Sequence, residues 1–366
     1  MQKELAQRLL SATLNWGDEE IEKYLEIISN FAELKYDEYQ QYRPGNRFLE
    51  NLSAWLNQFD KGVDRNTALG FVLNKLVFIS SSEMHRLIET VYPEIIRPIF
   101  RSQASAICDK NSIDISNQDA IIDLLKTKSL FLALSDGARI DILRRSAALA
   151  HDQVCVSYDL SEEKYEELVN EMNHRVDIFN SKTGMNPFVP DGFNHVFLLD
   201  DFSGSGISYL RIEDGVQKGK ISRVINSFLS TEGKQGSFKG ILKTHTKIHI
   251  VLYLATEKAL NNIRKSVAEA YSSENIDIDV SYVQIVNPTV LSSEEEVLFK
   301  KHYDLVREKV EDTHYCKGNM ERPHYGFDGC GLALVIHHNT PNNSFPVLWA
   351  GENALFPRVT RHKDVR

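Results

Sequence analysis

The sequence predicts a mixed α/β protein, in which a mostly parallel sheet follows an all-helical bundle. Two observations support this fold class. Up to about residue 105, apolar residues recur at intervals of three and four, which is the helical period. Beyond that point, short apolar runs alternate with helical stretches, and this order is typical of parallel βαβ units. We therefore predict a helical domain over residues 1–105 and an α/β domain over residues 106–366.

The N-terminal segment should contain four or five helices. Asp18 follows an Asn-Trp-Gly break and is a typical N-cap, with Glu19 and Glu20 in the first turn of the next helix. A second break, Arg-Pro-Gly-Asn at residues 43–46, precedes another apolar helical pattern. No residue spacing in this segment is typical of catalysis. We predict a docking or regulatory domain for a protein or nucleoprotein partner.

The α/β half contains six predicted strands separated by helices. Ligands of parallel sheets bind at the carboxyl ends of the strands, so the loops that follow the strands are where a site is expected. The predicted strands are residues 130–134, 154–158, 196–199, 248–254, 278–286 and 332–336. The predicted helices are residues 140–150, 162–179, 206–210 and onward, 257–271 and 294–309.

Composition and charge favour a folded protein that does not span a membrane. Hydrophobic residues make up 42% of the chain and charged residues 25%, as in folded globular proteins. The net charge of −9 argues against nucleic-acid binding by bulk charge. No apolar run has the length of about 18–20 residues that a membrane span needs, and the N-terminus lacks the apolar core of a secretory signal. Four scattered cysteines are typical of reduced thiols. We expect a cytoplasmic protein without membrane association.

The most informative segment is FLLDDFSGSGIS, residues 197–208. Its apolar run ends in Asp200 and Asp201, and a loop of small residues then leads into a predicted helix. Backbone N–H groups of such a loop bind phosphate, and the paired carboxylates suit sugar hydroxyls or Mg²⁺. A capped strand-to-helix turn is the alternative. The predicted phosphate-binding residues are Ser203, Gly204, Ser205, Gly206 and Ser208.

This segment resembles the phosphoribosyl diphosphate (PRPP) motif of type I phosphoribosyltransferases, an apolar strand followed by two acids and a Ser/Thr-Gly loop. The resemblance implies that Asp200 and Asp201 contact the ribose hydroxyls and that residues 203–208 hold the 5′-phosphate. It also implies PRPP as co-substrate and Mg²⁺ as cofactor, with Asp200 and Asp201 near the metal, and the sheet of that family as the fold.

A second loop, SDGAR at residues 135–139, supports the resemblance. It follows the first predicted strand of the α/β half, where type I phosphoribosyltransferases have their pyrophosphate loop. The resemblance implies that Ser135, Asp136, Gly137 and Arg139 hold pyrophosphate, with Arg139 as the basic, catalytic side chain. From its position alone, Asp136 suits either a magnesium ligand or the N-cap of the next helix.

Two other segments are predicted to flank this site. Residues 180–194 are polar and interrupted by Gly and Pro, which suits a flap over the site with Lys182 as a phosphate contact. A plain surface loop is the alternative. Residues 214–245 form an insertion rich in Gly and Lys, including Lys218 and Lys220. It suits an anionic partner surface, although solvated lysines are the usual explanation.

The segment 325–349 is predicted to recognise the acceptor. Its strand ends in polar residues, and amides beside an aromatic ring suit a base or nucleotide. We expect these side chains in the same cleft as Asp200. The alternative is an Asn/Pro turn whose aromatic residues return to the core. The predicted acceptor residues are Asn339, Asn342, Asn343 and Trp349.

The two loops and this C-terminal segment together resemble bacterial phosphoribosyltransferase-like proteins of anti-phage systems, including retron-associated ones. The resemblance implies a glycosyltransferase that moves ribose 5-phosphate from PRPP to a base or nucleotide-like acceptor, or cleaves the glycosidic bond of one. Asp201, His337 or His338 would serve as general base. The alternative is a regulatory protein that senses PRPP or a nucleotide without turnover.

Overall fold

The chain forms two compact units in a computed structural model that describes residues 3–111, 113–156, 162–187, 192–213, 215–229, 246–272, 276–312 and 314–358. Unit 1 comprises Met1–Met84 and Asn287–Arg366, and unit 2 comprises His85–Val286. This division differs from the predicted boundary near residue 105. Long-range strand pairing between the two ends of the chain, which no local pattern reveals, joins them into one unit.

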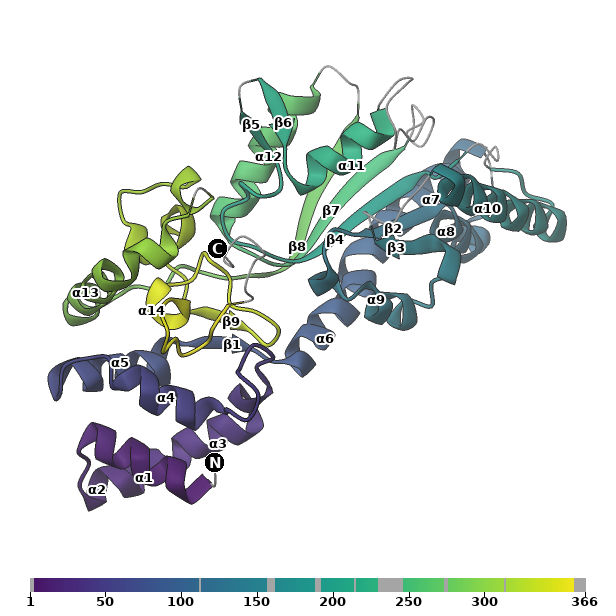
Figure 1. The fold of residues 1–366 in the computed structure, drawn as a ribbon. Coiled ribbons are helices and arrows are strands. Elements are labelled where there is room, and N and C mark those ends of the chain that lie inside the picture. Colours follow the sequence, from purple (N-terminus) through teal and green to yellow (C-terminus); the bar gives the residue numbers. More distant parts are fainter. Residues whose placement is uncertain are drawn as a thin grey trace. The chain divides into compact units, whose positions relative to one another are not determined.

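Unit 2 is built on a five-stranded parallel sheet with the strand order β3-β2-β4-β7-β8 (Figure 1). All five residues of β2 are buried, as is typical of a parallel strand covered on both faces. The predicted α/β class with a mostly parallel sheet is confirmed. The strands are β2 (Ser129–Ala133), β3 (Val154–Val156), β4 (His195–Ser203), β7 (Lys247–Ala255) and β8 (Asp277–Ile285).

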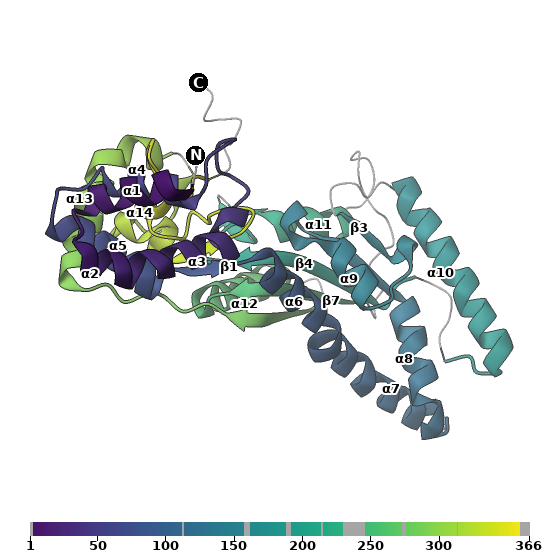
Figure 2. The same cartoon turned by 90° about the horizontal axis from the view of Figure 1, so that it is seen from below.

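Helices cover both faces of this sheet (Figure 2). One face packs apolar side chains against α10, α11 and α12 in a single core cluster. On the other face, Phe100 of α7 lies edge-on to Phe197 of β4, with ring centroids 5.9 Å apart. The helices are α6 (Ser81–Val91), α7 (Arg97–Asn111), α8 (Gln118–Thr127), α9 (Ile140–Ser146), α10 (Glu162–Thr183), α11 (Lys220–Leu229) and α12 (Glu257–Tyr271); β5 (Arg211–Glu213) and β6 (Val216–Lys218) form a hairpin.

Unit 1 combines the N-terminal helices with the C-terminal segment. β1 (Val77–Ile79) pairs in parallel with β9 (Leu334–Ile336), so Val77 lies in a strand although the domain over residues 1–105 was predicted to be all-helical. β9 is outside the main sheet. Trp55 donates a hydrogen bond from Nε1 to the carbonyl of Val347 at 2.7 Å. The helices of unit 1 are α1 (Lys3–Leu14), α2 (Asp18–Glu20), α3 (Glu26–Leu34), α4 (Phe48–Leu56), α5 (Val63–Lys75), α13 (Ser293–Val310) and α14 (Pro346–Trp349).

Short 3₁₀ and π turns complete both units. Among the helices that the structure describes, all are too short or too polar to cross a membrane. The short turns are Ile21–Leu25, Tyr36–Glu38, Tyr92–Ile96, Ile115–Asn117, Asp136–Ala138, His151–Gln153, Tyr315–Lys317, Pro323–Tyr325 and Phe327–Gly329.

Candidate functional site

The two predicted ligand loops of unit 2 lie next to each other. Strands β2 and β4 are parallel neighbours, with Ala133 in register with Leu199. The amide of Leu134 donates to the carbonyl of Leu199 at 2.8 Å, which extends the pairing by one residue. Because parallel neighbours end at the same edge of a sheet, the loop 135–139 and the loop 203–208 emerge side by side.

Asp200 joins these two loops through a network of three donors. Its Oδ1 accepts a hydrogen bond from the hydroxyl of Ser135. Its Oδ2 accepts from the hydroxyl of Tyr209 and from the ammonium of Lys220, each at 2.5 Å. Ser135 follows β2, Tyr209 follows the loop 203–208, and Lys220 begins α11. One carboxylate therefore holds three segments together.

Asp200, one of the two predicted ribose contacts, lies in an enclosed environment. Its side chain is completely buried. Burial raises the pKa of Asp200, the neighbouring Asp201 raises it further, and the Lys220 ammonium opposes both effects. Since both carboxylate oxygens already have partners, Asp200 is placed to organise the loops. Its predicted contact with the ribose hydroxyls stays a prediction.

Asp201 occupies a different environment from its neighbour. Successive side chains of a strand point to opposite faces, so Asp201 points away from the Lys220 side. It is only half-buried, whereas Asp200 has no exposed surface. Of the two predicted acids, Asp201 is the one that solvent and a ligand can reach.

The loop 203–208 has its carbonyls bonded and most of its amides unbonded. Thr256 donates from Oγ1 to the carbonyl of Gly204 at 2.6 Å, and Asn262 donates from Nδ2 to the carbonyl of Ser205 at 2.9 Å. Within the described residues, the amides of Gly204, Ser205, Gly206 and Ser208 have no acceptor, and the buried Ser203 hydroxyl has no partner. Consecutive free amides in a buried loop are the usual means of binding an anion.

The helix predicted to follow this loop is absent. The amides of Tyr209 and Leu210 both bond to the carbonyl of Gly206, which makes a single turn. The chain then enters the β5–β6 hairpin, and α11 begins only at Lys220. The turn needs the left-handed conformation of Gly206, with φ of 79°, because a Cβ there would lie 2.8 Å from the Ala259 carbonyl. The donors that this loop offers are therefore backbone amides without a helix N-terminus behind them.

The loop 135–139 is anchored from the middle of the sheet. Tyr253 of β7 donates from its hydroxyl to the carbonyl of Ala138 at 2.6 Å. Arg139 adopts a left-handed conformation with φ of 40°, and its exposed guanidinium forms an ion pair with Asp141 at 3.3 Å. The side chain of Asp136 is exposed and is not the N-cap of α9, which is Arg139. The N-cap alternative for Asp136 is therefore wrong.

The predicted magnesium site does not fit Asp200. Its two oxygens are already bonded, and the Lys220 ammonium lies where a cation would approach. Among the described residues, no group of three or more His, Cys, Asp or Glu side chains is arranged to hold a metal ion. Asp201 and the exposed Asp136 are the carboxylates of the two loops that stay accessible to a hydrated ion.

The predicted flap lies at the wrong end of the sheet. α10 continues to Thr183, so Lys182 belongs to its last turn. The amide of Asn194 donates to the carbonyl of Lys128, and β4 starts at the next residue. A segment that enters a parallel strand lies at the amino end of that strand, opposite the ligand loops. Residues 188–191 of the predicted flap lie outside the described residues, as do residue 214 and residues 230–245 of the predicted insertion.

The side chains of Asn343 and Trp349, which were predicted to bind the acceptor, already form hydrogen bonds within unit 1. Asn343 donates from Nδ2 to the Phe327 carbonyl at 3.1 Å and lies 3.3 Å from the Cys330 sulfur. Trp349 is buried and donates from Nε1 to the Ser344 carbonyl at 2.9 Å. The alternative of a turn whose aromatic residue returns to the core is correct for these two residues. Asn339 and Asn342 are half-buried, and their role stays a prediction.

Four residues that support the site were not predicted from the sequence to do so. Tyr209 and Lys220 hold Asp200, and Thr256 and Asn262 hold the carbonyls of the loop 203–208. Lys220 stood out only as one of several lysines in the predicted insertion. Thr256 is recognisable as the N-cap of α12, and it bonds to the loop in addition to capping that helix. Only strand pairing brings these residues to the site.

Comparison with known proteins identifies a family. The model of the PRTase-CE family matches residues 52–358, which include both loops and most of both units. No curated protein matches the chain, and no solved structure matches it.

Proposed function

Because the chain belongs to the PRTase-CE family, a phosphoribosyltransferase-like family, we propose that unit 2 binds PRPP at the carboxyl ends of β2 and β4. The loop 203–208 would receive the 5′-phosphate, Asp201 the ribose hydroxyls, and the loop 135–139 the pyrophosphate. The chain would transfer ribose 5-phosphate to a base or nucleotide-like acceptor, or cleave the glycosidic bond of such a molecule.

One observation carries this proposal. Four amides and the Ser203 hydroxyl in a buried loop have no acceptor among the described residues, beside an accessible acid at a strand end. Buried donors without partners are costly, so such a group is kept where a ligand satisfies it. A phosphate supplies several acceptor oxygens at one point, which suits several amides of one loop.

The proposed reaction needs no covalent nucleophile from the protein. The bond from the anomeric carbon to pyrophosphate breaks, a bond to the acceptor nitrogen forms, and the acceptor loses a proton. The ribose passes through a state with oxocarbenium character, which a nearby carboxylate stabilises. Asp201 would be the carboxylate for this role, and Arg139 would be the donor to the leaving pyrophosphate. To contact pyrophosphate, Arg139 must break its ion pair with Asp141, which is exposed and therefore weak.

Magnesium is part of the proposal only as an ion that accompanies the ligand. Mg²⁺ commonly keeps several waters and is held by substrate phosphates with one or two carboxylates. Asp136 or Asp201 would contact it, and Asp200 would not.

Calorimetric titration of the full chain with PRPP and Mg²⁺ tests the binding step. Ser203→Ala removes a hydroxyl that has no partner among the described residues, so it should lower the affinity about 10-fold while leaving stability unchanged. Ser222→Ala is the matched control, because the buried Ser222 hydroxyl bonds to the Gly219 carbonyl at 3.1 Å. It should lower stability and leave the affinity for PRPP unchanged.

The outcomes of this titration are distinct. Failure of the wild-type chain to bind PRPP rejects the proposal, and equal effects of both serine variants reject the assignment of the phosphate loop. Where binding is seen, release of pyrophosphate in the presence of a nucleotide pool separates turnover from sensing.

A second candidate function is PRPP or nucleotide sensing without turnover. It is favoured by the single basic side chain of the loop 135–139, Arg139, which is paired with Asp141. Weak stabilisation of the leaving group suits a binding protein better than a transferase. The proposed setting for either function is bacterial anti-phage defence, supported by the resemblance of the motifs to retron-associated proteins. A protein or nucleoprotein partner would act through the N-terminal helices.

A further inference from the structure

Three consecutive carbonyls at the end of β4 bond to the first part of α12. The Ser203 carbonyl accepts from the amide of Thr256 at 3.2 Å, and the Gly204 carbonyl accepts from the hydroxyl of the same residue at 2.6 Å. The Ser205 carbonyl accepts from Nδ2 of Asn262 at 2.9 Å. Successive carbonyls of an extended strand point to alternate sides, so three that bond to one helix mark a bend that α12 holds.

These bonds also fix the direction of three amides. A trans peptide group is planar, and its C=O and the N–H of the next residue point in opposite directions. Each carbonyl that is held toward α12 therefore turns the following amide away from α12. The amides oriented in this way are those of Gly204, Ser205 and Gly206, and they have no acceptor among the described residues. Three donors in a row thus point away from the helix that holds the loop.

The side away from α12 is the side of the other predicted ligand loop. α12 follows β7, and β4 lies between β7 and β2 in the sheet. For the amide of Gly204, which directly follows β4, the direction away from β7 is therefore toward β2. The loop 135–139 begins after β2 ends. A single ligand that carries phosphate groups at two ends can therefore reach both loops.

The loop 203–208 lies directly on α12 at Gly206. A Cβ at this glycine would lie 2.8 Å from the Ala259 carbonyl and 3.2 Å from the Cβ of Asn262. The φ of Gly206, 79°, is left-handed, and residues in this conformation are part of the backbone nests that bind anions. The position of α12 therefore determines the position of the loop.

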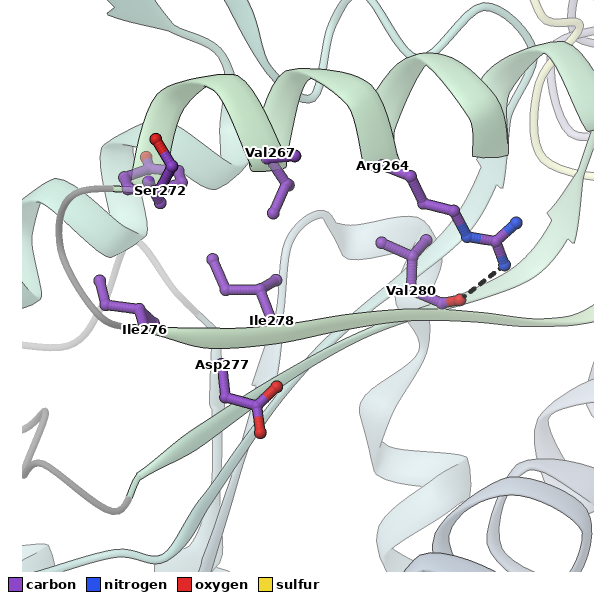
Figure 3. Close-up of a pocket in the computed structure, with 9 residues that line it drawn as sticks. Arg264, Val267, Ser272, Ile276, Asp277, Ile278 and Val280 are labelled. Atoms are coloured by element: carbon purple, nitrogen blue, oxygen red, sulfur yellow. Dashed lines mark hydrogen bonds between the residues drawn. The ribbon is translucent and has the colours of Figure 1, made fainter.

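The half of α12 that carries Asn262 is firmly packed. Leu260 and Ile263 are completely buried in the core cluster of unit 2. The second half, from Arg264 onward, borders a pocket of about 300 Å³ over β8, and Arg264 donates to the carbonyl of Val280 at 3.0 Å (Figure 3). Displacement of the first half would expose its apolar side chains to water. Asn262 therefore holds the loop from a rigid support.

We propose that Asn262 is a positioning residue of the anion site, which holds the Ser205 carbonyl so that the Gly206 amide stays turned toward the bound phosphate. The identity of the ligand as PRPP rests on the proposed function, whereas the role of Asn262 rests on the geometry of the loop. Thr256 orients the preceding amide in the same way, but it also caps α12 by accepting from the amide of Ala259 at 3.0 Å. Asn262 lies within the helix, so it is the cleaner position to test.

Amide signals of ¹⁵N-labelled glycine in the full chain test the proposal, with inorganic phosphate as the probe. Phosphate should shift the signals of Gly204 and Gly206 in the wild type and leave that of Gly326, whose amide is already bonded, unchanged. Asn262→Ala should remove the shift of Gly206 and keep that of Gly204, because a backbone bond that the variant leaves intact orients the Gly204 amide. A merely structural role of Asn262 would weaken both shifts together.

Substitutions of Asn261 are the matched controls, because this residue is the exposed neighbour of Asn262 on the same helix. Asn262→Ala should lower the affinity for phosphate about 10-fold, whereas Asn261→Ala, with the same gain in helix propensity, should leave it unchanged. Asn262→Asp keeps the shape but sets an acceptor against the Ser205 carbonyl, so it should lower the affinity about 100-fold. Asn261→Asp adds the same charge and should have a smaller effect.

Three outcomes overturn the role of Asn262. They are a Gly206 signal that still responds to phosphate in Asn262→Ala, a parallel loss of response at Gly204 and Gly206, and equal effects of the substitutions at Asn261 and Asn262. Failure of the proposed function has a different signature. A wild type that responds to phosphate but not to PRPP rejects PRPP as the ligand, and it supports the positioning role when the Gly206 response depends on Asn262. A wild type that responds to neither anion overturns both.

Discussion

Two polar segments of this chain follow apolar strands, and they use their polar groups differently. After β4, the loop 203–208 has its carbonyls bonded by Thr256 and Asn262, while four amides and the Ser203 hydroxyl have no acceptor among the described residues. After β9, the segment that contains Asn343 and Trp349 bonds to carbonyls of its own unit.

The difference follows from which sheet each strand joins. β4 is the middle strand of a five-stranded parallel sheet, so its loop meets the loop of a parallel neighbour at one edge. Among the described strands, β9 pairs with the three residues of β1, and its following segment is part of the core of unit 1. Polar residues after a strand therefore indicate a ligand site only where the surrounding structure leaves their donors unbonded.

The largest effect is expected from a methyl group added at a glycine of the first segment and at a glycine that packs against the second. In both glycines φ is positive, and a Cβ would lie 2.8 Å from the Ala259 carbonyl at Gly206 and 2.5 Å from the Asn343 carbonyl at Gly326. Gly206→Ala should lower the affinity for PRPP about 100-fold or more and destabilise the protein by about 2–3 kcal/mol. Gly326→Ala should cost similar stability without changing affinity, as measured by denaturant unfolding and calorimetry. Loss of PRPP binding in Gly326→Ala would break the comparison.

The next effect separates the paired acids within the first segment. Asp201→Asn should lower PRPP affinity or turnover by about 2–4 kcal/mol, because it removes the accessible charge, and should leave the melting temperature unchanged. Asp200→Asn should instead destabilise by about 1.5–3 kcal/mol, because the Lys220 ammonium loses its charged acceptor. Thermal unfolding of both variants beside calorimetry distinguishes the roles, and the reverse pattern contradicts them.

Low pH should destabilise unit 2 through two histidines buried near the amino ends of its strands, opposite the loops. The buried His195 and His249 lie 2.9 Å apart between Nδ1 and Nε2, and burial lowers their pKa values to about 3 and about 4. In the unfolded chain these histidines bind protons below their ordinary pKa of about 6.5, whereas in the folded chain they stay neutral there. The free energy of unfolding is therefore at its full value above a pH of about 6.5 and falls below it. Between pH 7.5 and pH 5.5, each imidazole should lower the free energy of unfolding by about 1.4 kcal/mol.

Chemical denaturation across that pH range measures this loss. His249→Gln should lower the slope of stability against pH while leaving PRPP affinity at pH 7.5 unchanged, because the imidazoles are at the amino ends of the strands. A pH slope unaffected by His249→Gln contradicts the assignment.

The smallest effect is expected in the second segment. Asn343→Ala removes the hydrogen bond to the Phe327 carbonyl and should lower the free energy of unfolding by about 1–2 kcal/mol. The affinity for PRPP and the transfer of ribose 5-phosphate to the acceptor substrate should not change. If Asn343→Ala instead lowers that transfer and leaves stability intact, the predicted role of Asn343 in binding the acceptor substrate would hold.

Local patterns in the sequence predicted much of unit 2. The predicted strands at residues 130–134, 248–254 and 278–286 correspond to β2, β7 and β8, and the helix at 257–271 corresponds to α12. Apolar runs and helical periodicity are local, so they can be recognised without a fold. The same patterns misplaced Val77, which lies in β1, because a short apolar segment at the end of a helix has the same composition as a strand.

The sequence by itself determined the α/β class, the parallel strands and the two loops that follow β2 and β4, because these depend on neighbours in the chain. Tertiary structure alone decided the rest. It buried Asp200 with Ser135, Tyr209 and Lys220 while leaving Asp201 accessible, and it turned Asn343 into a core residue. Those outcomes depend on which distant segments pair, and pairing is set by long-range packing that a linear pattern does not encode.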